Sequence, residues 1–403
     1  MQTENKKIII FGGGKIGRSF IGQLFSSGGY EVVFVDISLP VINELNKRGK
    51  YEVVIKSDTD KIIIVKNVRG VDARDKKLVA KEISDASILA VSVGLNALPH
   101  IIPLIADGLK ERYELNRKSA IDIIIAENMR NASQYFSEQL SKYLPEKYPL
   151  SDLVGLVETS IGKMVPIMPE KIEKEDALRV FAEPYNTLIL DKKAFINPIP
   201  DINGLSPKEN MKAWVDRKLF IHNLGHAATA YWGFFYDSRF QYVWEALEVP
   251  RIFSTVRDTM LQAAALLLKK YPDEFTTKDL TDHVDDLLSR FRNKALGDTI
   301  YRVGCDLLRK LGPEDRLAGA IRLAVALDMP YDKILKALIA GFEFRAKDEK
   351  GEMHPSDIQF TKIYEKGVTE VLKKVCGFDE TNFPQIIIEG EQMANKLHLL
   401  RDY

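Results

Sequence analysis

The first half of the chain alternates short β-branched runs with longer helical patterns. Buried strands are predicted at KIIIFG, YEVVFVD, KIIIVKNV, SILAVSV and IDIIIAE, and EPYNTLILDKKAF predicts one or two more that end near residue 195. Helices are predicted at KIGRSFIGQLFSSG and PHIIPLIADGLKERYEL. Strands that are apolar along their whole length are buried on both faces, and strand–helix alternation supplies the covering helices. The pattern therefore predicts an α/β fold built on a doubly wound parallel sheet.

The pattern changes after INPIPDINGLSPKEN, whose Pro, Gly and Asn content is typical of a linker. Residues 209–345 then follow a helical period, as in RIFSTVRDTMLQAAALLLKKY and DRLAGAIRLAVALDMP. We therefore expect two domains, an α/β domain over residues 1–197 and a mostly α-helical domain over residues 198–403. A cleft between two such domains is a usual place for a small ligand.

Composition and charge narrow the functional class. Of the 403 residues, 57 are Lys or Arg and 57 are Asp or Glu, so the net charge is zero and a nucleic-acid partner is not expected. The two cysteines, Cys305 and Cys376, have no pairing motif, which favours a reducing compartment. The chain has neither a signal-peptide pattern nor an apolar run of membrane-spanning length, so we expect a cytoplasmic protein without a membrane partner.

A glycine-rich loop, FGGGKIGRSFIG, links the first predicted strand to the first predicted helix. Gly12, Gly14 and Gly17 have the G-x-G-x-x-G spacing. The first glycine permits a tight turn, the second lets a pyrophosphate approach the backbone, and the third lets helix and strand pack closely. Lys15 and Ile16 complete the loop, and the helix N-terminus offers free N–H groups to phosphate. This context predicts a Rossmann-type dinucleotide site.

The second predicted strand ends in Asp36, at the distance from the glycines where an acid binds the adenosine ribose hydroxyls. Its carboxylate would repel a 2′-phosphate, and neither Ile37 nor Ser38 supplies a compensating cation. We therefore expect NAD rather than NADP as the cofactor. The alternative role of Asp36, capping a strand end, is disfavoured because strand, loop, helix and acid occur together.

The segment RKLFIHNLGHAATAYWG, residues 217–233, carries polar residues on one side of an otherwise apolar helix. With Lys218 at zero, His222 falls at about 40°, His226 at about 80° and Asn223 at about 140° on an α-helical wheel. Burial of such a helix lowers the pKa of a lysine and suits it to act as a general base. Asn223 and His226 are then donors to a developing alkoxide. The alternative is that Lys218 reaches solvent and the histidines bond each other or backbone carbonyls.

The segment YRVGCDLLRK supplies three cations, Arg302, Arg309 and Lys310. On a helix Arg302 and Arg309 share a face, and Lys310 is offset by about 80° from Arg302. Such a cluster can clamp a sugar phosphate. From the spacing alone, a solvated basic face is the favoured interpretation.

The chain resembles the polyol-specific long-chain dehydrogenases, the mannitol dehydrogenase family. The resemblance rests on four collinear segments: FGGGKIGRSFIG, AENMRNAS, RKLFIHNLGHAATAYWG and SRFRNKALGDTIYRVGCDLLRKLGPEDRL. It implies a metal-independent, NAD-dependent oxidoreductase whose substrates are D-mannitol 1-phosphate and D-fructose 6-phosphate, with hydride transfer at C5. It also implies roles for individual residues, with Lys218 as general base, Asn223 and Asn128 on the alkoxide, His226 orienting the substrate, and Arg302 and Lys310 contacting it. Glu127, next to Asn128, is the alternative candidate for shaping that loop.

The segment VETSIGKMVP departs from the family pattern V-D-R, because Gly162 and Lys163 replace the last two residues. This change favours a substrate that carries a phosphate or carboxylate group over a neutral polyol. The alternatives within the family are a mannitol 2-dehydrogenase or a reductase of fructuronate or tagaturonate. A zinc enzyme is disfavoured because the histidines are dispersed, apart from His222 and His226, and a non-catalytic nucleotide sensor would not need a buried Lys-Asn-His set. We expect a small-molecule substrate and a monomer or small homo-oligomer.

Overall fold

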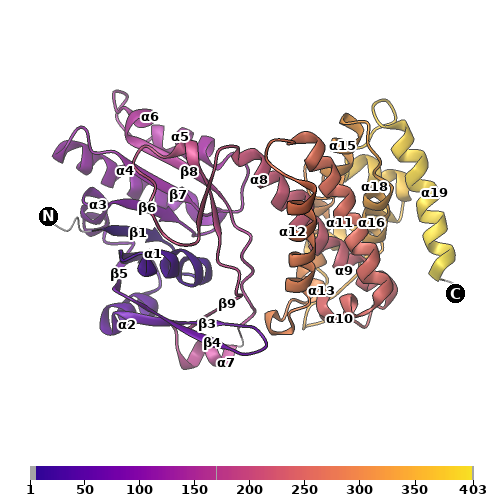
Figure 1. The fold of residues 1–403 in the computed structure, drawn as a ribbon, viewed down its shortest axis with the longest axis horizontal. Coiled ribbons are helices and arrows are strands. Elements are labelled where there is room, and N and C mark those ends of the chain that lie inside the picture. The colour runs from indigo at the N-terminus through magenta and orange to yellow at the C-terminus, as the bar shows by residue number, and fades with distance from the viewer. Residues whose placement is uncertain (1–5, 169, 402–403) are drawn as a thin grey trace. The chain divides into compact units, whose positions relative to one another are not determined.

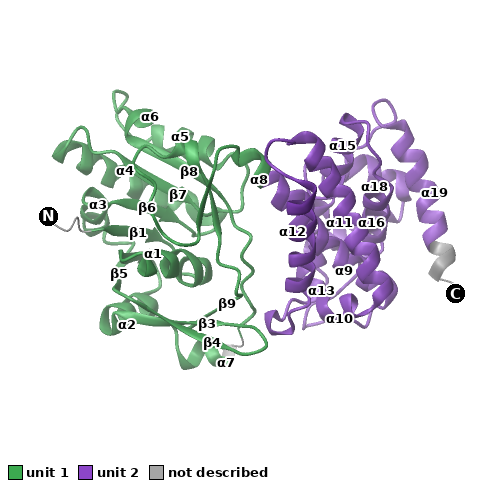
Figure 2. Ribbon diagram, in the orientation of Figure 1, with its two compact units in different colours: residues 1–214 green, residues 215–403 purple. Residues whose placement is uncertain are grey.

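The computed structural model describes residues 6–168 and 170–401 and is drawn as a ribbon in Figure 1. The chain divides into two compact units, which are residues 1–214 and residues 215–403 (Figure 2). The predicted boundary at residue 197 lies inside the first unit. The reason is that the predicted linker contains a strand, β11 (Leu205–Lys208), which pairs in parallel with β10 (Leu188–Asp191) and so stays with the sheet.

An eight-stranded sheet forms the middle of the first unit (Figure 1). Its strand order is β11, β10, β8 (Val154–Ser160), β7 (Ile121–Ile125), β6 (Ile88–Val91), β1 (Lys7–Phe11), β2 (Glu31–Asp36) and β5 (Val68–Asp72). From β5 to β8 every pairing is parallel, and only the β8–β10 pairing in this sheet is antiparallel. The prediction of a doubly wound parallel sheet is therefore confirmed, with an antiparallel junction near one edge.

Both faces of this sheet are buried, as the apolar strands require. On β1, Ile9 and Phe11 belong to one core and Ile8 and Ile10 to the other, since alternate side chains point to opposite faces. The first core contains residues of α3 (Lys76–Ser84), α4 (Leu98–Leu115) and α5 (Ala132–Ser141). The second contains residues of the π-helical segment η1 (Gly17–Gly22), α1 (Gln23–Ser27) and α2 (Leu39–Arg48). The first unit also contains the short helices α6 (Leu150–Leu153) and α7 (Glu170–Glu175), and α8 (Met211–Arg217) crosses the unit boundary.

The segment KIIIVKNV is not a buried strand, so that prediction was wrong. Its first part is β4 (Lys61–Lys66), which pairs with β3 (Lys50–Ile55) in a separate three-stranded sheet together with β9 (Val180–Ala182). Asn67 has a positive φ of 57° and breaks the strand before β5 begins. Ile62 and Ile64 are 56% and 44% exposed, because β4 is an edge strand with one open face. An apolar run alone therefore did not indicate burial here.

The described residues of the second unit form helices joined by loops, with one isolated β-bridge between Tyr242 and Thr299. Its longer helices are α9 (Leu224–Tyr236), α11 (Pro250–Lys270), α12 (Thr277–Phe291), α15 (Ala318–Ala326), α16 (Asp332–Phe342), α17 (Pro355–Tyr364) and α19 (Pro384–Arg401). Its shorter helices are α10 (Val243–Glu248), α13 (Ile300–Gly304), α14 (Leu307–Lys310) and α18 (Val368–Lys374). Helix α9 packs against α10, α11, α13 and α16. Gly225 lets α9 approach α11 closely, because a Cβ atom there would lie 2.5 Å from the Met260 sulfur. Within the described part of the chain, no helix is both long and apolar enough to cross a membrane.

Candidate functional site

The glycine loop has the geometry that the sequence motif predicts. Gly12 has a φ of 100°, and a Cβ atom there would lie 2.4 Å from the carbonyl oxygen of Ser92. A Cβ atom at Gly17 would lie 2.0 Å from the Gly12 carbonyl oxygen, so this position needs glycine for packing. Gly14 has no atom within 4 Å of its Cβ position. The space beside Gly14 is where a pyrophosphate would approach the backbone, so the loop fits a dinucleotide.

Two other loop residues, Lys15 and Ile16, differ in their surroundings. Lys15 is half-exposed and pairs with Glu173 of α7 at 3.0 Å, whereas Ile16 packs against the core that contains η1. The Arg18 N–H bonds to the Gly14 carbonyl, which places the first turn of the helical segment directly after the loop. The segment η1 is a π-helix rather than the α-helix that the pattern suggested. Such segments are rare and are enriched at functional sites.

Asp36 connects the end of β2 to the glycine loop. Its Oδ2 accepts a hydrogen bond from the Gly13 N–H at 2.7 Å, and its Oδ1 accepts one from the Ser38 N–H at 2.8 Å. The carboxylate therefore faces the loop, in the position expected for an acid that binds ribose hydroxyls. Each oxygen keeps a further lone pair for such a hydroxyl.

An arginine that the sequence analysis overlooked bonds to the residue that follows this acid. Arg74 follows β5 and donates to the Ile37 carbonyl at 3.3 Å. Its guanidinium also bonds to Asp72, at 2.8 Å from Oδ1, and the hydrogen bond from Arg74 lowers the pKa of Asp72. Asp72 is the β5 residue in register with Asp36 on β2. Arg74, which contacts the residue after Asp36, is therefore neutralised by Asp72.

The loop that follows β7 holds Glu127 and Asn128. The Glu127 carboxylate is buried and accepts hydrogen bonds from the N–H groups of Val93 and Gly94 at 2.7 and 2.9 Å. Burial raises the pKa of Glu127. Glu127 thus ties this loop to the end of β6, the shaping role considered for it from the sequence. Asn128 lies beyond the carboxyl end of its strand, where open α/β sheets bind ligands.

Lys163, which replaces the family arginine, is buried in the first unit. Its amine donates to the Asn186 side chain at 2.7 Å and lies 5.0 Å from the centre of the Phe20 ring. A lysine held in this way is fixed by both an amide and a ring face. It is thus a rigid cation rather than a solvated one.

In the second unit, Lys218 begins a π-helical turn, η4 (Lys218–Asn223), between α8 and α9. The N–H of Leu224 bonds to the carbonyl of Leu219, five residues earlier. Residues five apart lie on one side of such a turn, so Lys218 and Asn223 come closer in direction than the 140° or so of an α-helical wheel. His226 follows on α9. The π-helical turn therefore turns Lys218 and Asn223 to a more similar direction than the α-helical pattern predicted.

The surroundings of Lys218 suit a general base. The residue is partly buried, and burial, together with the positive charge of Arg316, lowers the pKa of its amine to about 8. A lysine with this pKa is neutral in about a tenth of molecules at pH 7, far more than an ordinary lysine. His222 is buried, and desolvation lowers the pKa of its imidazole well below the ordinary value. His222 remains neutral and packs against the Phe291 ring at 5.7 Å between ring centres.

His226 is held between a ring and a carboxylate. It stacks on Phe291 with 4.5 Å between ring centres and 5° between planes. Its Nε2 lies 3.2 Å from Oδ2 of Asp298, and the other carboxylate oxygen of Asp298 pairs with Arg302. Burial lowers the pKa of His226, and Arg302 acts in the same direction. Asp298 opposes this shift because a carboxylate favours the charged imidazolium.

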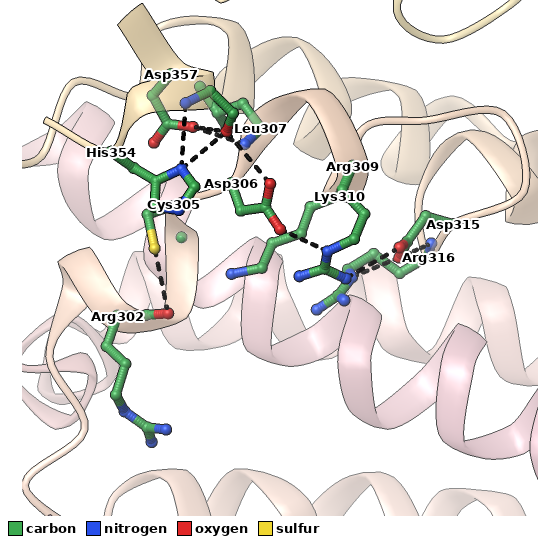
Figure 3. Close-up of polar contacts among 12 residues, drawn as sticks. Arg302, Cys305, Asp306, Leu307, Arg309, Lys310, Asp315, Arg316, His354 and Asp357 are labelled. Atoms are coloured by element: carbon green, nitrogen blue, oxygen red, sulfur yellow. Dashed lines mark hydrogen bonds and ion pairs between the residues drawn. The ribbon is translucent and has the colours of Figure 1, made fainter. Parts of the chain in front are cut away.

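The three predicted cations of the YRVGCDLLRK segment have different environments (Figure 3). Arg302 is half-exposed and pairs with Asp298. Lys310 is buried and donates to the Val303 carbonyl at 2.7 Å, and burial lowers the pKa of its amine to about 8. Arg309 instead bonds to two acids, Asp306 and Asp315. The structure therefore links Arg302 to His226 through Asp298 and leaves Arg309 in a separate ion-pair group.

A fourth cation, Arg316, was missed in the sequence. It is buried, it bonds to Asp315 at 2.8 Å, and its Nη1 donates to the Asn223 carbonyl at 3.4 Å. Asp298 was missed as well. Both lie inside the last of the four matched sequence segments, and that position was the available signal. Among the described residues, no group of three or more His, Cys, Asp or Glu side chains is placed to hold a metal ion.

Comparisons with known proteins identify the family of the chain. Residues 6–204 match the family model of the mannitol dehydrogenase Rossmann domain, and residues 210–386 match that of the mannitol dehydrogenase C-terminal domain. A mannitol-1-phosphate 5-dehydrogenase of Lactococcus lactis subsp. cremoris (strain MG1363) is 32% identical over 398 residues, 97% of this chain and 98% of the relative. The enzyme of the same name from Streptococcus pneumoniae (strain ATCC 700669 / Spain 23F-1) is 30% identical over 387 residues, 95% of this chain and 99% of the relative.

Two solved structures share the fold at low sequence identity. The Pseudomonas fluorescens mannitol 2-dehydrogenase in ternary complex with NAD and D-mannitol has a TM-score of 0.72 and 16% identity, covering 100% of this chain and 95% of that one. A substrate-free D-sorbitol dehydrogenase has a TM-score of 0.79 and 17% identity, covering 99% and 93%. Both family models and the relatives of nearly equal length lead to one conclusion: the chain is an oxidoreductase that belongs to the mannitol dehydrogenase family.

Proposed function

We propose that the protein is an NAD-dependent oxidoreductase that interconverts D-mannitol 1-phosphate and D-fructose 6-phosphate by hydride transfer at C5. The observation that carries this proposal is the partly buried Lys218, with a pKa of about 8, on a π-helical turn shared with Asn223 and followed by His226. The nearly full-length relatives named mannitol-1-phosphate 5-dehydrogenase support the choice of substrate.

NAD is the cofactor that the first unit fits best. Gly12, Gly14 and Gly17 would bind the pyrophosphate, with Lys15 and Ile16 completing the loop. Asp36 would accept hydrogen bonds from the ribose hydroxyls. When bound, the nicotinamide supplies the hydride acceptor for oxidation and the donor for reduction. The Asp72–Arg74 pair supports NAD over NADP, because the arginine near Asp36 is already neutralised.

Lys218 is the proton-transfer residue in this mechanism. In oxidation its neutral amine takes the proton of the C5 hydroxyl, and in reduction its ammonium returns a proton to the same oxygen. The amides of Asn223 and Asn128 stabilise the alkoxide oxygen, and His226 orients the hydroxyl. Because the pKa of Lys218 is about 8, the oxidation rate should rise with pH through that value, and the reduction rate should fall. The mechanism needs no metal, since the base and the donors are side chains.

The phosphate of the substrate requires cations in the second unit. We assign contact with it to Arg302 and Lys310. Arg302 pairs with Asp298, which contacts His226, and Lys310 lies close enough to Arg316 for that charge to lower the pKa of its amine. Arg309 is the weaker candidate, because Asp306 and Asp315 already neutralise it. We also propose a reducing, cytoplasmic location, since Cys305 and Cys376 both carry free thiols.

The deciding experiment compares Lys218→Ala with Lys212→Ala, an exposed lysine on the same helical run. NADH oxidation is followed with fructose 6-phosphate, fructose and fructuronate in parallel, and NADH binding is titrated by fluorescence. We expect fructose 6-phosphate to be the preferred substrate. Lys218→Ala should lose at least about 100-fold in kcat and still bind NADH, whereas Lys212→Ala should match the wild type.

Other results of this experiment would contradict the proposal in distinct ways. A preference for fructose or fructuronate would reassign the substrate to a free polyol or a hexuronate. NADH binding without turnover of any ketose would indicate a nucleotide sensor. Near-normal turnover by Lys218→Ala would remove the lysine from its role as base.

A further inference from the structure

Asp298 occupies a fixed, buried position between His226 and Arg302. It is 2% exposed and precedes Thr299, whose side chain accepts a hydrogen bond from the Arg302 N–H at the start of α13. The backbone around it is bonded to residues 241–243: the Val243 N–H donates to the Asp298 carbonyl at 3.0 Å, and the Ile300 N–H donates to the Gln241 carbonyl at 2.8 Å. The main chain therefore allows the Asp298 carboxylate little freedom.

The carboxylate contacts two positively charged or chargeable groups. Oδ2 lies 3.2 Å from the His226 Nε2, and Oδ1 pairs with the Arg302 guanidinium. The His226 ring is also stacked on Phe291. His226 is thus fixed in plane by Phe291 and in rotation by Asp298, because rotating the ring would take Nε2 away from the carboxylate.

A carboxylate buried to this extent is costly unless both of its oxygens are paired. The charge of Asp298 is compensated by ion-pair contacts from two helices, with His226 on α9 and Arg302 on α13, although neither carboxylate oxygen nor His226 Nε2 makes a hydrogen bond of good geometry. Both partners have proposed roles toward the substrate, whereas Asp298 itself is buried behind them. A carboxylate beside one imidazole nitrogen also selects the tautomer with its proton on that nitrogen. Here Nε2 would carry the proton, and Nδ1 would be free to accept one from a hydroxyl.

We propose that Asp298 is a positioning residue for the reaction, whose buried carboxylate fixes the tautomer of His226 and the orientation of Arg302. The inference rests on the proposed function, since it assumes that His226 and Arg302 act on the substrate. In this proposal one acid aligns two side chains that contact the substrate, His226 at the reacting hydroxyl and Arg302 at the phosphate.

The charged groups around His226 determine how removal of Asp298 should change the protonation of the imidazole. Arg302, Lys310, Arg316 and Arg290 all lower the pKa of the imidazole, in addition to burial. His222, one turn earlier on the helix, is itself neutral. Asp298 is the acid paired with His226, and its loss leaves the imidazole neutral but without a preferred tautomer.

The first test is Asp298→Asn, which keeps the shape and removes the charge. Asp237→Asn is the matched control, because Asp237 forms an Asp–Arg pair with Arg239 at the surface. We expect Asp298→Asn to lower kcat by about 10- to 100-fold and to raise the KM for fructose 6-phosphate, with NADH binding unchanged. Wild-type kcat and KM in Asp298→Asn would overturn the proposal.

The second test reads the His226 ring directly and does not depend on turnover. The chain has six histidines, so the ¹⁵N signals of His226 can be assigned by a single substitution. In the wild type we expect a neutral ring with the proton on Nε2, and in Asp298→Asn a mixture of tautomers. A proton on Nδ1 in the wild type would overturn the proposal, even if the asparagine variant failed to fold.

A double-variant cycle separates positioning from a general loss of structure. If Asp298 acts through Arg302, Asp298→Asn should raise the KM much less in an Arg302→Gln background than in the wild type. Full additivity of the two KM effects, with unchanged His226 signals, would mean a structural role only. Failure of the proposed function has a different signature, namely wild-type protein with an Nε2-protonated His226 but no activity on fructose 6-phosphate.

Discussion

Arg316 donates a hydrogen bond from its guanidinium to the backbone carbonyl of Asn223, at 3.4 Å, across 93 positions of sequence. The bond attaches the loop before α15 to the π-helical turn that carries Lys218. Burial is the main cause of the low pKa of both Lys218 and Lys310, and Arg316 is the largest charged contributor to each. One buried arginine therefore supports the backbone of the turn and favours the neutral form of its lysine.

Removing this charge should shift the pH dependence of the reaction. In Arg316→Gln the pKa of Lys218 should rise from about 8 toward the ordinary lysine value of about 10.4. A larger fraction of Lys218 is then protonated at any given pH, so the rising limb of kcat/KM for mannitol 1-phosphate oxidation should move to higher pH. Arg316→Lys keeps the charge and should shift the limb less. Superimposable profiles for wild type and Arg316→Gln would show that the arginine does not influence the base.

Alanine substitutions at two glycines of the loop should affect stability and cofactor binding separately. An alanine at Gly17 would place a methyl group 2.0 Å from the Gly12 carbonyl, so we expect a loss of about 1–3 kcal/mol in the free energy of unfolding. An alanine at Gly14 meets no atom within 4 Å and should be nearly neutral for stability. It should weaken NADH binding, since the methyl group fills the space for the pyrophosphate. Urea unfolding and NADH fluorescence titration measure the two effects, and wild-type affinity in Gly14→Ala would place the cofactor elsewhere.

Cofactor preference should depend on two acids. Asp36→Ala should reduce the preference for NAD over NADP, because the repulsion of a 2′-phosphate is removed. The double variant Asp36→Ala with Asp72→Asn should use NADP better still. In it Arg74, which lies beside Ile37, would no longer be paired with a charged Asp72. The ratio of kcat/KM for NAD and NADP measures this. Adding Arg74→Ala should cancel the second gain, and an unchanged ratio in Asp36→Ala would contradict the assignment of the acid.

Glu82 should account for part of the acid sensitivity of the first unit. Burial raises the pKa of Glu82, but hydrogen bonds from Arg69 and Lys7 outweigh it and lower the pKa to about 2. A carboxyl with a lower pKa folded than unfolded stabilises the protein above the unfolded value, and this contribution is lost as the pH falls from about 4.5 toward 2. Glu82→Gln should lower the free energy of unfolding at pH 7 by roughly 2 kcal/mol and flatten its dependence over this range.

The control for this effect is Glu44→Gln, which removes more exposed and longer pairs with Lys47 and Arg48. It should change the free energy of unfolding by no more than about 0.5 kcal/mol at either pH. Chemical denaturation at several pH values compares the variants. Parallel pH profiles for wild type and Glu82→Gln would contradict the role of Glu82.

Local patterns in the chain were sufficient for the main framework. The apolar runs at β1, β2, β6 and β7 predicted a sheet buried on both faces, and the glycine spacing predicted the loop that follows β1. The run RKLFIHNLGHAATAYWG placed Lys218, Asn223 and His226 on one helical segment. These predictions hold because periodicity, turn geometry and residue type act over a few residues, and neighbours in sequence are then neighbours in space.

Contacts between distant segments decided the rest. KIIIVKNV has the composition of a buried strand, but its first part lies at the edge of a second sheet because β3 pairs with it there. The pairing of Asp298 with His226, and the bond from Arg316 to Asn223, join residues more than 70 positions apart. No local pattern encodes these features, since each depends on which strand or charged side chain the folded chain brings beside a distant partner.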